Sequence, residues 1–120
     1  PWEEIRCFPT NMFMAAGNSS VPEMISSTDR GILVTRFHYV NPVHPTKTII
    51  TGMTRDGTFL VEGGRVVRGL RNLRFTESIL GALSRIEAIS RDRAILGGLV
   101  SIVAPALKIR GFTFTGITEF

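Results

Sequence analysis

Residues 51–75 restrict the fold more than any other stretch, because two turn signals and five arginines fall within it. Asp56-Gly57 lies between two short apolar runs. This dipeptide is typical of a two-residue hairpin turn, whose central positions both need positive φ. Glu62-Gly63-Gly64 predicts a second turn directly after the second run. We therefore expect an up-down-up β-ribbon around which the rest of the chain is arranged.

The flanking segments predict further strands and two short helices. Ser20, with Glu23 three residues later, is typical of a capping box and predicts a helix over residues 21–28. Thr76 predicts an N-cap for a second helix over residues 77–85. Strands are expected near residues 12–14, 32–40, 46–54, 87–89, 100–109 and 112–115, with Pro105 placing its strand at an edge or a bulge.

These patterns predict a mainly β (α+β) fold, in which antiparallel sheets form a sandwich or barrel-like domain of six to eight strands with two short helices. The 120 residues are enough for one domain, 1–120, with a modest core. The composition, 43% hydrophobic and 20% charged, is that of an ordinary globular protein. The chain begins Pro-Trp-Glu-Glu without an initiator methionine, so we expect a fragment that lacks the N-terminal domain of its parent.

Charge and cysteine content narrow the cellular setting. The net charge of +4 is too small to require nucleic acid as a partner. A single cysteine, Cys7, rules out an internal disulfide framework and favours a reducing compartment, the cytoplasm. The most apolar stretch, residues 94–107, is too short to span a bilayer, so no membrane is expected as a partner.

No self-contained active site is expected from the residue pattern. Cys7, His38 and His44 lack the spacing of metal ligands, so packing or surface roles are favoured. The serines do not form a nucleophile elbow, the glycines do not form a phosphate-binding loop, and the acids do not form a general acid/base pair. We therefore predict no catalytic residue and no metal ligand in this chain.

A basic cluster is the remaining candidate for a binding site. Arg65, Arg68, Arg71 and Arg74 recur at every third position, and Arg55 is close by. One interpretation is a solvated face paired with Asp56, Glu62 and Glu77, since such surface pairs are common and weak. The other is a patch that holds a partner's carboxylates or a nucleic-acid backbone.

Several blocks of the sequence, taken together, resemble a known family. They are Pro9-Thr10-Asn11 followed by Gly17, G-I-L-V-T-R-F at 31–37, T-G-M-T-R-D-G-T-F-L-V-E-G-G at 51–64, N-L-R-F-T-E-S at 72–78 and P-A-L-K-I-R-G-F-T-F at 105–114. In content and order they resemble the C-terminal domain of the TldD/PmbA family, whose members have also been named modulators of DNA gyrase.

The resemblance implies a cytoplasmic parent that works as one of two paired subunits of a zinc-dependent peptidase, with unfolded peptides as substrates. In the metal-bearing subunit, an H-E-x-x-x-H helix lies upstream and a cysteine ligand lies shortly before the final strands. This chain has no H-E-x-x-x-H, and residues 88–103 contain no cysteine. The resemblance therefore implies the metal-free subunit type or a diverged member. No cofactor is assigned to this chain, and zinc belongs to the parent assembly.

Three functional hypotheses follow. In the first, the chain is a scaffold and peptide-binding domain, in which a peptide adds to the strand at 46–54 along Gly52, Met53, Thr54 and Arg55. The alternative is a nucleic-acid-associated regulator that uses the arginine-rich ribbon. The third is a dimerisation domain whose exposed strand edge pairs with a second subunit.

Overall fold

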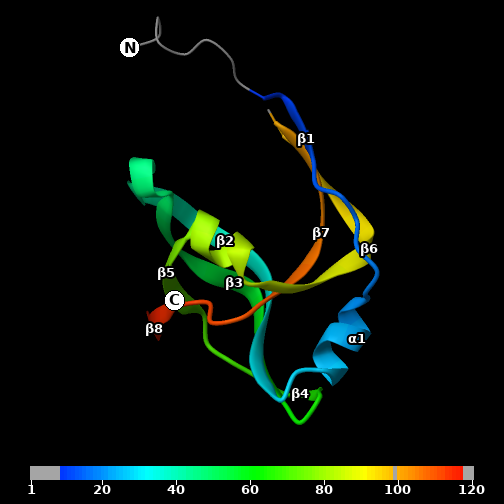
Figure 1. The fold of residues 1–120 in the computed structure, drawn as a ribbon. Helices are drawn as coiled ribbons and strands as arrows, with labels where there is room; N and C mark the ends of the chain where they lie inside the picture. The colour runs from blue at the N-terminus through cyan, green and yellow to red at the C-terminus, as the bar shows by residue number, and fades with distance from the viewer. Residues whose placement is uncertain (1–8, 99, 118–120) are drawn as a thin grey trace, which may run out of the picture.

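The computed structural model describes residues 9–98 and 100–117, so the predictions for Cys7 lie outside the described residues. Two sheets make up the fold (Figure 1). The first has the order β1-β7-β6. The second has the order β2-β3-β5-β8, with β4 on the other half of β3. The strands are β1 (Asn11–Phe13), β2 (Arg30–His44), β3 (Ile49–Glu62), β4 (Arg65–Gly69), β5 (Leu73–Ser78), β6 (Ile86–Leu96), β7 (Ser101–Ile109) and β8 (Phe114–Ile117).

The predicted class is confirmed: the fold is mainly β, and the described residues form eight strands in two largely antiparallel sheets that do not close into a barrel. Two α-helices, α1 (Val21–Ser26) and α2 (Ile79–Ser84), have six residues each. A 3₁₀ turn, η2 (Pro45–Lys47), joins β2 to β3. No helix in the described part of the chain is long and apolar enough to cross a membrane.

A serine hydroxyl group caps the N-terminus of each α-helix. Ser20 Oγ accepts a hydrogen bond of 3.2 Å from the backbone N–H of Glu23, which confirms the predicted start of α1. The predicted cap of α2 is wrong by two residues. Thr76 remains in β5, where its hydroxyl donates to Thr51 Oγ1, and Ser78 caps the helix by accepting from Gly81 N–H at 3.0 Å.

Asp56-Gly57 does not form the predicted hairpin turn. β3 continues through it, and the residues on both sides pair with the same neighbour, β2. The register shifts between Val34 and Arg36, where β3 carries one extra residue. Asp56 (φ 63°) and Gly57 (φ 138°) do have positive φ, but they use it to form a β-bulge. The long antiparallel neighbour has outweighed the local turn preference.

The second predicted turn is confirmed at Gly63-Gly64, where β3 reverses into β4. Both glycines have positive φ, 58° and 80°. Their N–H groups donate to the carbonyls of Asp29 and Thr28, at 2.8 and 2.9 Å, so the turn is fixed to the segment between α1 and β2. Figure 1 shows α1 beside this hairpin.

Two strand boundaries differ from the prediction: β2 ends later than expected, and β3 begins later. β2 passes Pro42 and ends only at His44, with register shifts after His38 and after Pro42. Residues 46–48 are not strand, since η2 and its cap occupy them and β3 begins at Ile49. Pro105 fits its prediction, because it lies beyond the residues of β7 that pair with β1 and beside an irregularity in β6.

Aromatic side chains form the best-packed part of the interior. Phe75 lies 4.7 Å from Phe37 and 5.5 Å from Phe112 between ring centroids, and Phe114 extends the cluster beyond Phe112. Few other apolar side chains in residues 9–98 and 100–117 are buried; they are Met24, Met53, Val61 and Ala82. The radius of gyration is 15.5 Å, against about 13–14 Å for a compact domain of this length. The domain is therefore less compact than its length predicts, and a cleft is open between β2 of one sheet and the end of β7 of the other.

Candidate functional site: a strand edge with its cleft, and a basic sheet face

The predicted peptide-binding residues, Gly52, Met53, Thr54 and Arg55, lie in an interior strand. In this part of β3, Met53 pairs with His38 of β2 on one side and with Arg74 of β5 on the other. Met53 is 4% exposed and Thr54 is fully buried. Strand addition by a peptide needs an unpaired edge. The expected mode of binding at these residues therefore does not fit the fold.

The aromatic cluster requires a glycine at position 52. A Cβ at this position would lie 2.9 Å from Phe75 Cε1 and 3.1 Å from Val40 Cγ2. Phe75 cannot move away easily, because the rings of Phe37 and Phe112 pack against it.

We expect Gly52→Ala to lower the free energy of unfolding by about 1–3 kcal/mol, the usual cost of overpacking a core. Urea denaturation measures the change. Gly69→Ala is the matched control, because this strand glycine would meet nothing within 4 Å and has no positive φ. Equal losses in the two variants would contradict the assigned role of Gly52.

β2 provides a long open strand edge. Among the described residues it pairs with β3 only, so its other side is unpaired from Arg30 to His44. Beside its first half lies a cleft of about 750 Å³ between β2, α1 and the end of β7. The lining is largely apolar and includes Met24, Ile32, Leu33, Phe37, Leu107 and Ile109. This edge lies one strand away from the residues predicted to bind peptide, because the number of neighbours of a strand is not readable from its own residues.

Charged groups hold the rim of this cleft together. Lys108 Nζ donates to Ser27 O at 3.2 Å and to Ser27 Oγ at 3.0 Å, and it forms an ion pair with Glu87 at 3.7 Å. Arg91 pairs with Glu23 of α1 at 3.5 Å. These contacts attach both ends of α1 to the β6–β7 sheet, so one wall of the cleft is positioned by side chains that the sequence did not single out.

Glu77 is a buried carboxylate with a full set of donors. It accepts from the N–H groups of Ser78 (3.1 Å) and Thr113 (2.8 Å) and forms an ion pair of 3.0 Å with Arg85. Burial alone raises the pKa of this carboxyl group. The hydrogen bonds from Arg85, Thr113 and Ser78 outweigh burial and hold its pKa below the ordinary value. Both oxygens face internal donors, so the group fixes the approach to β8 and is not a free acid or base.

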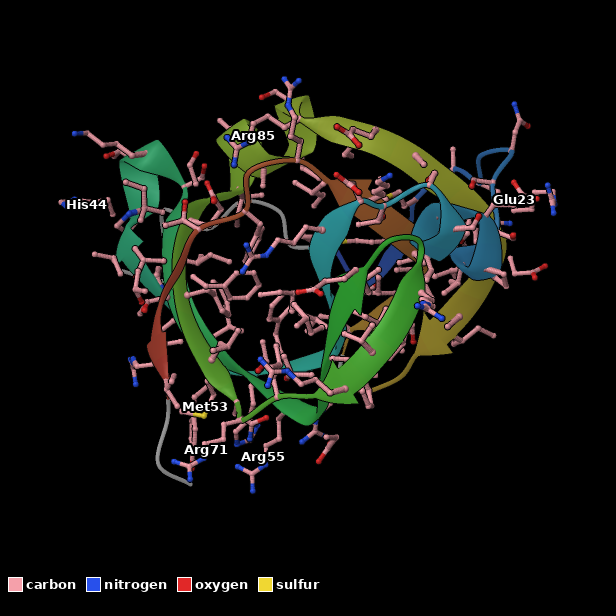
Figure 2. All side chains as sticks on the ribbon, turned by 90° about the horizontal axis from the view of Figure 1, so that it is seen from below. Glu23, His44, Met53, Arg55, Arg71 and Arg85 are labelled. Carbon is pink, nitrogen blue, oxygen red and sulfur yellow. The ribbon has the colours of Figure 1, made fainter. Side chains whose placement is uncertain are left out.

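The predicted basic cluster divides into two groups. Arg65 and Arg68 lie on β4, opposite Glu62 and Leu60. Arg36 and Arg55 are cross-strand partners, and Arg74 pairs with Met53, two residues from Arg55. By the alternation of the strands, these three arginines lie on the face opposite Phe37 and Phe75. Figure 2 shows Arg55 and Arg71 projecting outward beneath β3. We call Arg36, Arg55, Arg71 and Arg74 the basic face.

The acids do not pair with the arginines as expected. Asp56 forms a 2.9 Å ion pair with Arg36, and Glu77 pairs with Arg85. Within residues 9–98 and 100–117, no carboxylate forms an ion pair with Arg55, Arg71 or Arg74. A fully paired, solvated face is therefore wrong for these three side chains.

The described residues do not fit a zinc site. No group of three His, Cys, Asp or Glu side chains among them lies close enough to hold a metal ion. His38 packs against Tyr39, with 4.2 Å between ring centroids, and His44 lies at the far end of β2 beside η2.

Residues 3–116 match the family model described as the PmbA/TldA metallopeptidase C-terminal domain. The chain belongs to the TldD/PmbA family. The resemblance noted in the sequence is thereby confirmed over nearly the whole chain. A comparison with curated proteins gives no match.

Solved structures share the fold of this TldD/PmbA domain. TldE from Thermococcus kodakarensis matches with a TM-score of 0.75 and 18% identity, over 87% of this chain and 23% of that chain. A proposed modulator of DNA gyrase from Bacteroides thetaiotaomicron matches with a TM-score of 0.72 and 23% identity, over 88% and 23%. One from Thermotoga maritima gives 0.70 and 17%, over 88% and 24%. The chain thus spans about a quarter of these proteins.

Proposed function

We propose that this chain is the C-terminal scaffold and peptide-binding domain of a cytoplasmic TldD/PmbA-type metallopeptidase assembly, which cleaves unfolded peptides. The matching family is described as a metallopeptidase C-terminal domain, which supports metal-dependent peptide hydrolysis as the reaction of the assembly. The shared fold with TldE, over about a quarter of that chain, supports a role as one domain of a larger subunit.

The proposed subunit is of the metal-free type. Residues 88–103, where the family resemblance would place a cysteine ligand, contain no cysteine. A second TldD/PmbA-type subunit would hold the zinc, which supplies an activated water for amide hydrolysis when bound. The residues of this chain would bind and orient the peptide.

The observation that carries the proposal is the open edge of β2 beside the apolar cleft. An extended peptide can add to such an edge through main-chain hydrogen bonds, which do not depend on its sequence. Its alternate side chains would then enter the cleft, where Ile32, Leu33 and Leu107 offer apolar contacts. This mode of binding suits unfolded substrates of varied sequence.

We expect Ile32→Gln to reduce kcat/KM for an unstructured peptide about 5–10-fold in the full-length protein assembled with its partner subunit. The substitution removes apolar contact worth about 1 kcal/mol with little change in side-chain size. Val67→Gln is the matched control. Val67 is 44% exposed against 36% for Ile32, and it lies on β4 outside the cleft. Equal kcat/KM values for the two variants would reject the cleft as the peptide site.

The second candidate function, a nucleic-acid-associated regulator, draws on the arginines without carboxylate partners on the basic face. Two structural neighbours carry the description of proposed DNA gyrase modulators. Binding of this kind would weaken steeply with salt, because phosphate contacts release counterions. Binding of a labelled DNA duplex that depends on Arg71 and Arg74 would support this function.

A further inference from the structure

We propose that the basic face, formed by Arg36, Arg55, Arg71 and Arg74, docks an acidic, extended segment of a partner protein. Arg36 and Arg55 are direct cross-strand partners on β2 and β3. Arg74 is the partner of Met53, two residues from Arg55 on the same side of β3. Neighbouring strands lie about 4.8 Å apart and alternate residues about 7 Å apart. Three guanidinium groups therefore originate from one small area of the sheet.

Arg71 belongs to this area although it lies in the loop between β4 and β5. Leu70 N–H donates to Thr58 O at 2.7 Å, and Leu73 N–H donates to Thr54 Oγ1 at 2.9 Å. These two bonds hold the loop against β3 on either side of Arg55. In Figure 2, Arg55 and Arg71 project to the same side of the molecule, in agreement with these bonds.

The clustering of these arginines lowers the stability of the fold unless an anion offsets their mutual repulsion. Like charges directly opposite each other in a sheet repel, as Arg36 and Arg55 do. Asp56 neutralises Arg36 only. For the other three arginines, the described residues provide no ion-pairing carboxylate. A partner that brings carboxylates would remove this repulsion, so the charge of the face is complementary to an acidic ligand.

Carboxylates fit this face better than a phosphate backbone does. Asp56 Oδ2 lies 2.9 Å from Arg36 Nε, so the face already accommodates a carboxylate–guanidinium contact. An extended segment with a carboxylate at every second position presents charges about 7 Å apart, and flexible arginine side chains that start from neighbouring strands about 4.8 Å apart can reach them. Asp56 would repel a continuous run of phosphates, whereas a polypeptide can place a polar or basic residue opposite it.

The face is distinct from the cleft of the proposed function. Phe37 and Phe75 point to the interior side of the sheet, and Phe37 lines the cleft. Arg36 and Arg74, each adjacent to one of these residues in a strand, point to the opposite side. A short substrate cannot occupy both, so the inference concerns a separate partner and does not rest on the peptidase role.

Fluorescence anisotropy with the full-length protein tests the proposal. The probe is a labelled peptide of four Glu-Ser repeats, titrated at 50 mM salt. We expect Arg71→Gln/Arg74→Gln to weaken binding about tenfold, a loss of one or two charge contacts. Arg65→Gln/Arg68→Gln removes the same charge from β4 and is expected to change binding less than twofold. Circular dichroism confirms that both double variants remain folded.

Three outcomes would overturn the proposal. The first is no binding of the acidic peptide by the wild-type protein at 50 mM salt. The second is an equal weakening in the two double variants, which would indicate attraction by net charge alone. The third is tighter binding of a labelled 16-base-pair DNA duplex with the same dependence on Arg71 and Arg74, which would assign the face to nucleic acid.

Discussion

Replacing Phe75 by alanine is expected to lower the free energy of unfolding by about 3–5 kcal/mol, the usual range for removing a buried phenylalanine. Phe75 is 1% exposed. Its ring contacts Phe37 and Phe112, with centroids 4.7 and 5.5 Å away, and closes over Gly52. Because few other side chains are buried as deeply, the cavity would remove the centre of the five-stranded sheet's inner face. Urea denaturation measures the loss.

Phe13→Ala is the control for this prediction. Phe13 is 72% exposed on β1, so its replacement should change the free energy of unfolding by less than about 0.5 kcal/mol. If Phe75→Ala and Phe13→Ala cost the same, the aromatic cluster would not be the centre of stability. A large loss for Phe75 alone would also explain why an alanine at Gly52, which would push this ring, is expected to be harmful.

Glu77→Gln should cost up to about 3 kcal/mol at neutral pH, because Thr113 N–H and Arg85, whose side chain is 30% exposed, would lose the charged acceptor that they share. The variant keeps the shape of the side chain but loses the charge that accepts from Arg85 and from Thr113 N–H. Glu62→Gln is the control, since Glu62 is exposed on the β3–β4 hairpin. A similar loss at Glu62 would mean that net charge, rather than the buried network, is responsible.

The stabilising effect of the Glu77 carboxylate should depend on pH. The pKa of Glu77 in the folded protein lies below the ordinary value of 4.5. The carboxylate therefore contributes its stability above that value and loses it as pH falls through the lowered pKa. The difference in unfolding free energy between wild type and Glu77→Gln should have its largest value at pH 7 and should decrease as the pH falls below 4.5. A difference that grows below pH 4.5 would contradict the assignment.

Features controlled by neighbouring residues were largely predictable from sequence. Ser20 caps α1 because its hydroxyl needs only the N–H three residues later. Gly63-Gly64 reverses the chain because both positions need positive φ. Thr76 and Ser78 are equivalent as local caps, and only the pairing of Thr76 with Thr51 in the sheet decides between them.

The strand neighbours could not be predicted in this way. Asp56-Gly57 has the composition of a hairpin turn, yet β2 is long enough to pair on both sides of it, and the dipeptide becomes a bulge. Gly52 is a place of close approach, and the approaching group is the ring of Phe75 from the next strand, which the residues around Gly52 do not reveal. The peptide site predicted at 52–55 stays a prediction, but strand addition is blocked at Gly52 and Met53, where β3 pairs with β2 on one side and with β5 on the other.

The sequence by itself determined the mainly β class, the start of α1, the Gly63-Gly64 turn and the family, since these depend on residue type and local order. Only the tertiary structure decided that residues 51–62 form one continuous interior strand, that the open edge belongs to β2, and that Arg71 and Arg74 gather with Arg36 and Arg55. The physical reason is that strand pairing is a long-range choice: each strand carries its alternation of faces, but burial against distant partners selects which strand lies beside it.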